Sequence, residues 1–154
     1  MAVATEAIAR GGGDSAMEWM LIVLCVCVSW IDLRYRRIPN RAILTGLAAS
    51  MLIGLILWPE GLWPGRIGSG GAMLLAFGTV SWLLPSALGM GDAKLLGLLG
   101  FALGLRASII IVTLASLLAL LVSLYLLVKN RMDGRSELPF APFVTVGLLL
   151  YCQA

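Results

Sequence analysis

The chain has 154 residues, of which 60% are hydrophobic and 12% are charged, and its formal net charge is +3. Soluble domains carry about 25% charged residues, so this composition excludes a soluble globular domain and a disordered chain and indicates an integral membrane protein. The chain has no histidine, which excludes a Ser-His-Asp triad and most zinc sites, and we expect neither a metal nor a cofactor.

Charged residues divide the chain into six apolar runs. Four of the runs approach or exceed the 20 or so residues that a spanning helix needs. The other two are shorter: one ends at Asp32, and the other begins just after Asp92 and Lys94. Both lengthen into short helices if Asp32 and Asp92 lie within the membrane boundary. The sequence therefore predicts an all-α, polytopic bundle of about six transmembrane helices, near residues 17–33, 42–58, 67–87, 92–105, 107–128 and 138–153.

Residues 1–16 are predicted to form a flexible N-terminal tail, and residues 17–154 a single membrane-embedded domain. In the first helix, Cys25, Ser29 and Asp32 share one face through i, i+4, i+7 spacing, and we expect that face to turn inward.

The later helices carry signals at their ends. Asn40 is expected to cap the start of the second helix. In the fourth helix, Gly97, Gly100 and Gly104 are expected to pack closely against another helix, the last two as a Gly-x-x-x-Gly motif. Pro139 suits the first turn of the sixth helix, which Pro142 is expected to kink.

Basic residues predict the orientation of the bundle, because Lys and Arg gather on the cytoplasmic side. Eight of the eleven lie in the first, third and fifth loops, so that side is predicted to be cytoplasmic and both termini to lie outside. A single long span over 95–128 would bury Arg106 in the membrane and leave equal numbers of basic residues on its two sides. Six spans are therefore the better interpretation.

Asp32 and Asp92 both fall near the predicted cytoplasmic side, at similar depth. The orientation was predicted from lysine and arginine alone, so the shared location of the two aspartates is an independent observation. Two adjacent carboxylates share a proton, so that one takes a proton from water while the other polarises a carbonyl. This is aspartyl peptidase chemistry, which needs no histidine or metal. The structural alternative is that each aspartate caps a helix or pairs with a neighbouring cation, Arg34 or Lys94.

Gly89 and Gly91 precede Asp92 at the third and first positions. Glycine permits unusual backbone angles and the close approach of another chain, and a protease must bind its substrate as extended backbone. The alternative is a simple glycine turn between the third and fourth helices.

Two groups of residues on the same predicted side of the membrane stand out together: Asp32-Leu33-Arg34 with Ile38-Pro39-Asn40, and Gly89-Met90-Gly91-Asp92-Ala93-Lys94-Leu95-Leu96. Their order and spacing resemble the type IV prepilin peptidase family of GxGD-type membrane aspartyl peptidases. The late segment Pro139-Phe140-Ala141-Pro142-Phe143 is similar to a further motif of that family. The resemblance covers most of residues 17–150.

The resemblance implies an endopeptidase that removes the basic leader from prepilins or pseudopilins at the cytoplasmic face of the inner membrane. It implies Asp32 and Asp92 as the catalytic pair, Gly89 and Gly91 as loop-shaping residues, and Lys94 as a supporting residue. The expected partners are a prepilin and the lipid bilayer, not a nucleic acid. The cysteine-bearing segment of longer bifunctional members does not precede the first motif here, so N-methyltransferase activity is not expected.

Several alternatives stay open. The short form resembles peptidases of tight-adherence (Flp) pilus systems, and the archaeal preflagellin peptidases are close relatives. From another class, a small ion-coupled transporter would use intramembrane aspartates as a proton relay, and a Ser/Lys hydrolase would pair Lys94 with Ser86 or Lys129 with Ser123. The sequence does not determine the oligomeric state.

Overall fold

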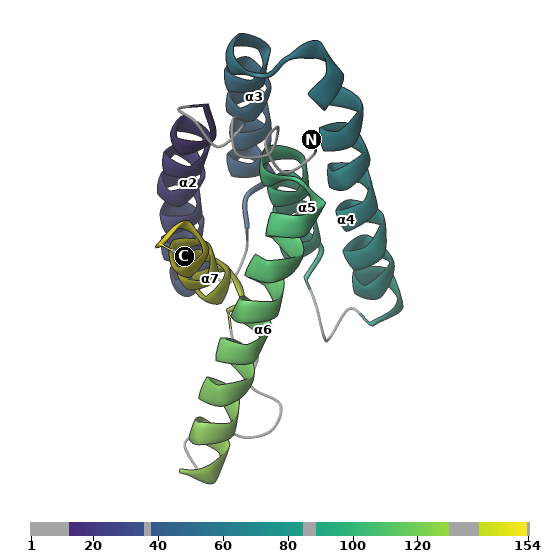
Figure 1. Cartoon of the computed structure of the whole chain (residues 1–154). Helices are drawn as coiled ribbons and strands as arrows, with labels where there is room; N and C mark the ends of the chain where they lie inside the picture. The colour runs from purple at the N-terminus through teal and green to yellow at the C-terminus, as the bar shows by residue number, and fades with distance from the viewer. Residues whose placement is uncertain (1–12, 36–37, 85–88, 130–138, 154) are drawn as a thin grey trace.

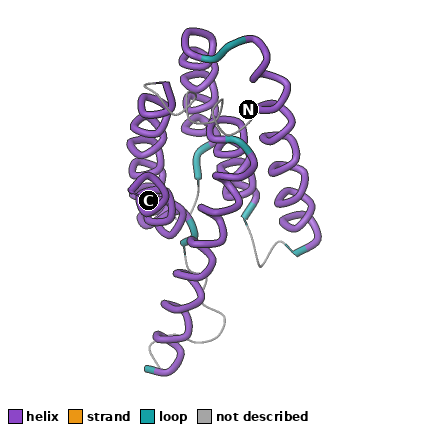
Figure 2. Tube along the Cα trace, in the orientation of Figure 1, coloured by secondary structure: helices purple, strands orange, loops and turns teal. Residues whose placement is uncertain are grey.

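The computed structural model describes residues 13–35, 38–84, 89–129 and 139–153 (Figure 1). Regular structure in these ranges is entirely helical, without a strand, which confirms the predicted all-α fold (Figure 2). The elements in chain order are α2 (Gly13–Tyr35), α3 (Asn40–Leu57), the short 3-10 helix η1 (Glu60–Leu62), α4 (Trp63–Leu83), α5 (Met90–Leu103), α6 (Leu105–Val128) and α7 (Ala141–Gln153).

Three helices of the described residues are long and apolar enough to cross a bilayer, namely Ser15–Tyr35 within α2, Asn40–Leu57 and Leu105–Val128, and α7 is a shorter apolar helix. The residues that α3 buries are small, Gly46, Ser50 and Gly54, whereas Leu55 and Ile56 are exposed. Helices that pack together in lipid typically place small residues in the interface between helices and large apolar residues on the outer surface. The protein is therefore a membrane protein.

Each predicted span coincides with one helix, with ends that differ by at most four residues. α2 begins at Gly13, so residues 13–16 of the predicted tail are helical, because Met17 is anchored in the core and Asp14 and Ser15 are residues that favour a helix start. Residues 1–12 lie outside the described ranges.

Two predicted helix starts are wrong in detail. Pro39, with extended backbone, is the N-cap of α3, and the Asn40 side chain makes no capping bond because it binds elsewhere. Pro139 precedes α7, whereas Pro142 is the proline in its first turn. Since a first-turn proline lacks only an N–H that would have no intrahelical partner, Pro142 does not kink the helix.

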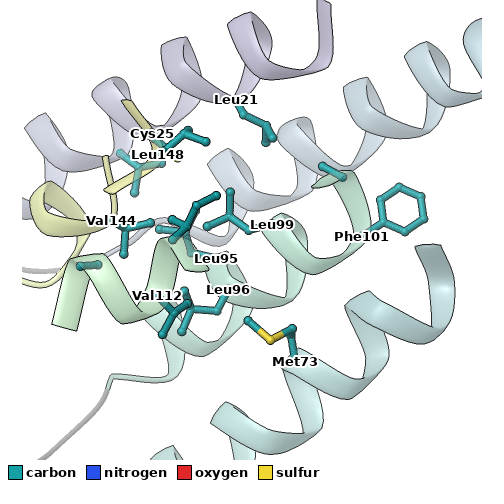
Figure 3. Close-up of a cluster of buried hydrophobic side chains, with 14 of the residues drawn as sticks. Leu21, Cys25, Met73, Leu95, Leu96, Leu99, Phe101, Val112, Val144 and Leu148 are labelled. Atoms are coloured by element: carbon teal, nitrogen blue, oxygen red, sulfur yellow. The ribbon is translucent and has the colours of Figure 1, made fainter. Parts of the chain in front are cut away.

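α5 is the central helix of the bundle and contacts α2, α3, α4 and α6. Nine of its 14 residues are buried, among them Leu95, Leu96 and Leu99. Figure 3 shows Leu95 and Leu99 on the side of Leu21 and Cys25 of α2 and Val144 and Leu148 of α7, and Leu96 beside Val112 of α6 and Met73 of α4. A helix that is apolar on all sides is stable only when other elements surround it, and this burial holds the first turn of α5, with Asp92, at one end of the bundle.

Glycines let α5 approach α4 closely. A Cβ atom at position 100 would lie 2.8 Å from the carbonyl oxygen of Ser69 and 3.1 Å from the Cα of Gly70. Gly97 packs against Leu74 in the same interface, so the expected close packing is confirmed for Gly97 and Gly100. It is wrong for Gly104, whose φ of 85° ends α5 and starts the reversal into α6.

Candidate active site

Asp32 lies in the last turn of α2 on the face that was expected to turn inward. Cys25, Ser29 and Asp32 are exposed by 1%, 8% and 7%, which confirms that expectation. Their i, i+4, i+7 spacing places all three along the side of α2 that packs against α7. The carboxyl of Asp32 is therefore held inside the bundle and not at the lipid surface.

The start of α7 meets the Asp32 carboxyl. The backbone N–H of Ala141, the first residue of α7, donates to Asp32 Oδ2 at 3.4 Å. This distance is long for a hydrogen bond, but the N–H groups of a helix start carry no intrahelical partner and form its positive end, which favours a carboxylate there. One oxygen of Asp32 is thus engaged by the last helix.

A pair of hydroxyls joins the same two helices one turn away. Ser29 Oγ and Thr145 Oγ1 are 2.6 Å apart, and both side chains are buried. Thr145 was not among the residues that we predicted for the site. The sequence did contain a signal, since a threonine one turn after Ala141 in an apolar helix needs a polar partner.

Asp92 lies in the first turn of α5, after the N-cap Gly89. Its Oδ1 atom is fully shielded and has no hydrogen-bond partner among the described residues. Its Oδ2 atom lies against Gly89, where a Cβ atom would be 3.3 Å away. Because buried polar atoms are nearly always hydrogen-bonded, the unpartnered Oδ1 is the strongest mark of a reactive site in this part of the chain.

Both aspartates lie at the same end of the bundle, because Asp32 is in the last turn of α2 and the segment that follows α2 rests on the first turn of α5, which holds Asp92. The neighbouring cations face other groups: the Arg34 guanidinium lies 5.9 Å from the centre of the Tyr35 ring, and the Lys94 ammonium donates to Asn40 Oδ1 at 2.9 Å. The geometry therefore favours a pair of carboxyls over two separate local ion pairs.

Gly91 provides close approach and not unusual backbone. A Cβ atom at Gly91 would lie 2.9 Å from the Cβ of Ile38, so the segment that follows α2 rests directly on the first turn of α5. The expected unusual backbone angles are wrong: Gly89 is extended (φ −71°, ψ 145°), Gly91 is helical, and among the described residues Gly104 is the one glycine with positive φ.

Lys94 and Asn40 form the second contact between the two motifs. Lys94 is one turn after Gly91, and Asn40 is two residues after Ile38. The apolar contact and the hydrogen bond together fix the start of α5 against the start of α3. Lys94 thus binds the start of α3 through Asn40, the residue that we had predicted to cap that helix.

Two further points concern metal binding and the predicted residues that lie outside the described ranges. The described residues contain no group of three or more His, Cys, Asp or Glu side chains that could hold a metal ion. Ser86, a candidate nucleophile of the Ser/Lys alternative, lies outside the described ranges, as do five basic residues that entered the predicted orientation: Arg10, Arg36, Arg37, Arg131 and Arg135.

Comparison with known proteins identifies a matching family and several similar proteins. Residues 19–124 match the type IV leader peptidase family. A prepilin leader peptidase/N-methyltransferase of Bacillus subtilis (strain 168) is 28% identical over 134 residues, which are 85% of this chain and 52% of the relative. Proteins of the same name from Xanthomonas campestris pv. campestris and Pseudomonas putida are each 32% identical, over 83% and 85% of this chain and 46% of their own length. The chain spans about half the length of these relatives, and no solved structure matches it significantly.

Proposed function

The chain belongs to the type IV leader peptidase family, and from that premise we propose that it is a membrane aspartyl endopeptidase that removes the basic leader of prepilins or pseudopilins. The names of three relatives as prepilin leader peptidases support the substrate class. The observation that carries the proposal is the pair of aspartates at one end of the bundle: Asp32 is buried, and Asp92 is half-buried with its Oδ1 atom shielded and unpartnered.

Asp32 and Asp92 act together on one water molecule. Since two adjacent carboxyls cannot both ionise readily, they hold one proton between them. The ionised carboxylate takes a proton from the water molecule, and the water oxygen attacks the scissile carbonyl carbon. At the same time the protonated carboxyl donates a hydrogen bond to the carbonyl oxygen. A proton then passes to the leaving amine, the C–N bond breaks, and the new carboxyl terminus is released with the leader.

The site faces the cytoplasm in this proposal. Arg34 lies in the last turn of α2 with Asp32, Arg41 lies in the first turn of α3, and Lys94 lies close after Asp92 in α5. Basic residues mark the cytoplasmic side of membrane proteins. Prepilin leaders are expected on that side, just ahead of an apolar stem helix. The proposal therefore includes a multi-pass protein of the cell membrane, with residues 17–154 as its peptidase domain and both termini outside.

Co-expression with a prepilin tests the proposed function. We expect the prepilin to lose its leader, seen as a mobility shift and as a new N-terminus by mass spectrometry. The ion-coupled transporter, which the family membership does not favour, would leave the prepilin intact and change ion flux across the membrane. An intact prepilin beside correctly inserted protein would contradict a peptidase for that substrate class.

Lys94 is expected to support the reaction without being essential. Lys94→Ala removes the exposed hydrogen bond to Asn40, and a solvent-screened bond is worth about 0.5–1.5 kcal/mol, so we expect cleavage to slow roughly twofold to tenfold. Asn40→Ala should slow cleavage similarly, and the double variant should be no slower than either single one, because the two side chains share one interaction.

Lys129→Ala is the matched control for this pair. Its ammonium lies 4.7 Å from the centre of the Tyr125 ring at the far end of α6, so its loss should leave the cleavage rate unchanged. Complete loss of cleavage in Lys94→Ala, or rate losses that multiply in the double variant, would mean that Lys94 acts directly on the reacting groups.

A further inference from the structure

Thr145 is a polar residue in the apolar helix α7, and its hydroxyl has three polar neighbours. Its Oγ1 atom lies 2.6 Å from Ser29 Oγ, 3.1 Å from the carbonyl oxygen of Cys25 and 3.0 Å from that of Ala141. Either hydroxyl can be the donor in the Ser29–Thr145 pair, and when Ser29 donates, the single hydroxyl proton of Thr145 is free to bond one of the two carbonyls. The result is a closed buried network between α2 and α7.

The network lies one helical turn from the Asp32 carboxyl on both helices. On α2, Ser29 precedes Asp32 by three residues, and on α7, Thr145 follows Ala141 by four. Ala141 is the residue whose N–H donates to Asp32 Oδ2. A slide or rotation of α7 along α2 would therefore break the hydroxyl pair and the contact to the carboxylate together.

The energy of the hydroxyl pair is small beside its geometric effect. A single hydrogen bond between two helices in a membrane contributes little to the stability of a bundle. By contrast, a displacement of about 1 Å at a catalytic group can cost roughly a hundredfold in rate. Loss of the Thr145 hydroxyl should therefore affect the reaction more than the stability of the bundle.

We propose that Thr145 is a positioning residue for Asp32, which it holds through the start of α7. With Oδ2 engaged by Ala141, Oδ1 is the Asp32 oxygen left to meet the water and Asp92. This inference rests on the proposed peptidase function, deepens it by giving α7 a part in the reaction, and assigns Ser29 as the partner of Thr145.

Purified full-length enzyme and a purified prepilin in detergent micelles test the proposal, with kcat and KM measured separately. Thr145→Val keeps the shape of the side chain and removes its hydroxyl. We expect kcat to fall roughly tenfold to a hundredfold with KM within about twofold of wild type. Thr145→Ser restores the hydroxyl and should return kcat to within about threefold of wild type.

Thr113→Val is the matched control, because its hydroxyl is bonded to the Ile109 carbonyl of its own helix at 2.7 Å and is exposed on α6. It should leave kcat unchanged. Ser29→Ala removes the other half of the pair and should also lower kcat, which keeps the proposal testable if Thr145→Val does not fold.

Two sets of outcomes separate this proposal from the proposed function. If the wild-type protein does not cleave prepilin, the peptidase function itself is wrong. If the wild-type protein cleaves and Thr145→Val or Ser29→Ala keeps wild-type kcat, the positioning role is wrong. A Thr145→Ser variant as slow as Thr145→Val would also overturn it, because the hydroxyl would then not be the cause.

Discussion

Asparagine at either Asp32 or Asp92 should stop leader cleavage. Asparagine matches aspartate in shape but cannot accept or release the proton that the pair shares, and removal of a general acid or base costs about 10²–10⁴-fold in rate. We expect kcat to fall at least about a thousandfold in each single variant, since both carboxyls act on one water. The double variant should be no slower, because either loss already disables the pair. Cleavage of a co-expressed prepilin, with the enzyme quantified in the membrane fraction, gives the measurement.

Glu60→Gln is the control for these variants. Glu60 is an exposed acid in η1, away from the helix ends that carry the two aspartates, and its amide variant should cleave normally. Normal processing by Asp32→Asn or by Asp92→Asn would show that the remaining carboxyl suffices and that the paired mechanism is wrong. Loss of the variant protein from the membrane would instead show that the aspartate serves folding.

Leucine at Gly100 should produce the largest loss of stability. A Cβ atom there would already lie 2.8 Å from the Ser69 carbonyl oxygen and 3.1 Å from the Gly70 Cα, and backbone atoms of α4 cannot move aside as a flexible side chain can. Overpacking costs about 1–3 kcal/mol and sometimes more, and we expect about 3 kcal/mol or more here. Loss of helical circular dichroism during titration with a denaturing detergent measures the change.

Gly68→Leu provides the matched control on the neighbouring helix. A Cβ atom at Gly68 meets no heavy atom within 4 Å, so a leucine there projects into open space and should leave the unfolding midpoint nearly unchanged. Equal midpoints for Gly100→Leu and Gly68→Leu would contradict the close packing of α4 on α5. Because α5 carries Asp92, we also expect Gly100→Leu to reduce cleavage.

The sequence predicted the helices well because charged residues interrupt apolar runs where membrane helices end. The inward face of α2 was also predictable, since Cys25, Ser29 and Asp32 repeat at helical spacing within one segment. Both signals are local: they depend on residues near one another in the chain and on a periodicity that any amphipathic helix shows.

The remaining details depend on contacts between distant segments. Ser29 and Thr145 are 116 residues apart, and Lys94 and Asn40 are 54 apart, so no local pattern could pair them. Gly91 was expected to adopt unusual backbone angles. Its backbone is helical instead, and the absence of a side chain lets Ile38, from the other motif, pack directly against it. Gly104 follows Gly100 by four residues, a spacing that would place both on one face of a helix. The positive φ of Gly104 ends α5 first, so Gly104 does not join Gly100 on the face that packs against α4.

The separation of the Asp32 and Asp92 carboxyls in a structure with uncleaved prepilin bound is the most direct test of the proposed chemistry. We predict that one oxygen of each lies within hydrogen-bond distance of the same water, which places the two carboxyls within about 6 Å of each other. Carboxyls held farther apart than one water can bridge, with protein atoms between them in the substrate-bound state, would contradict it.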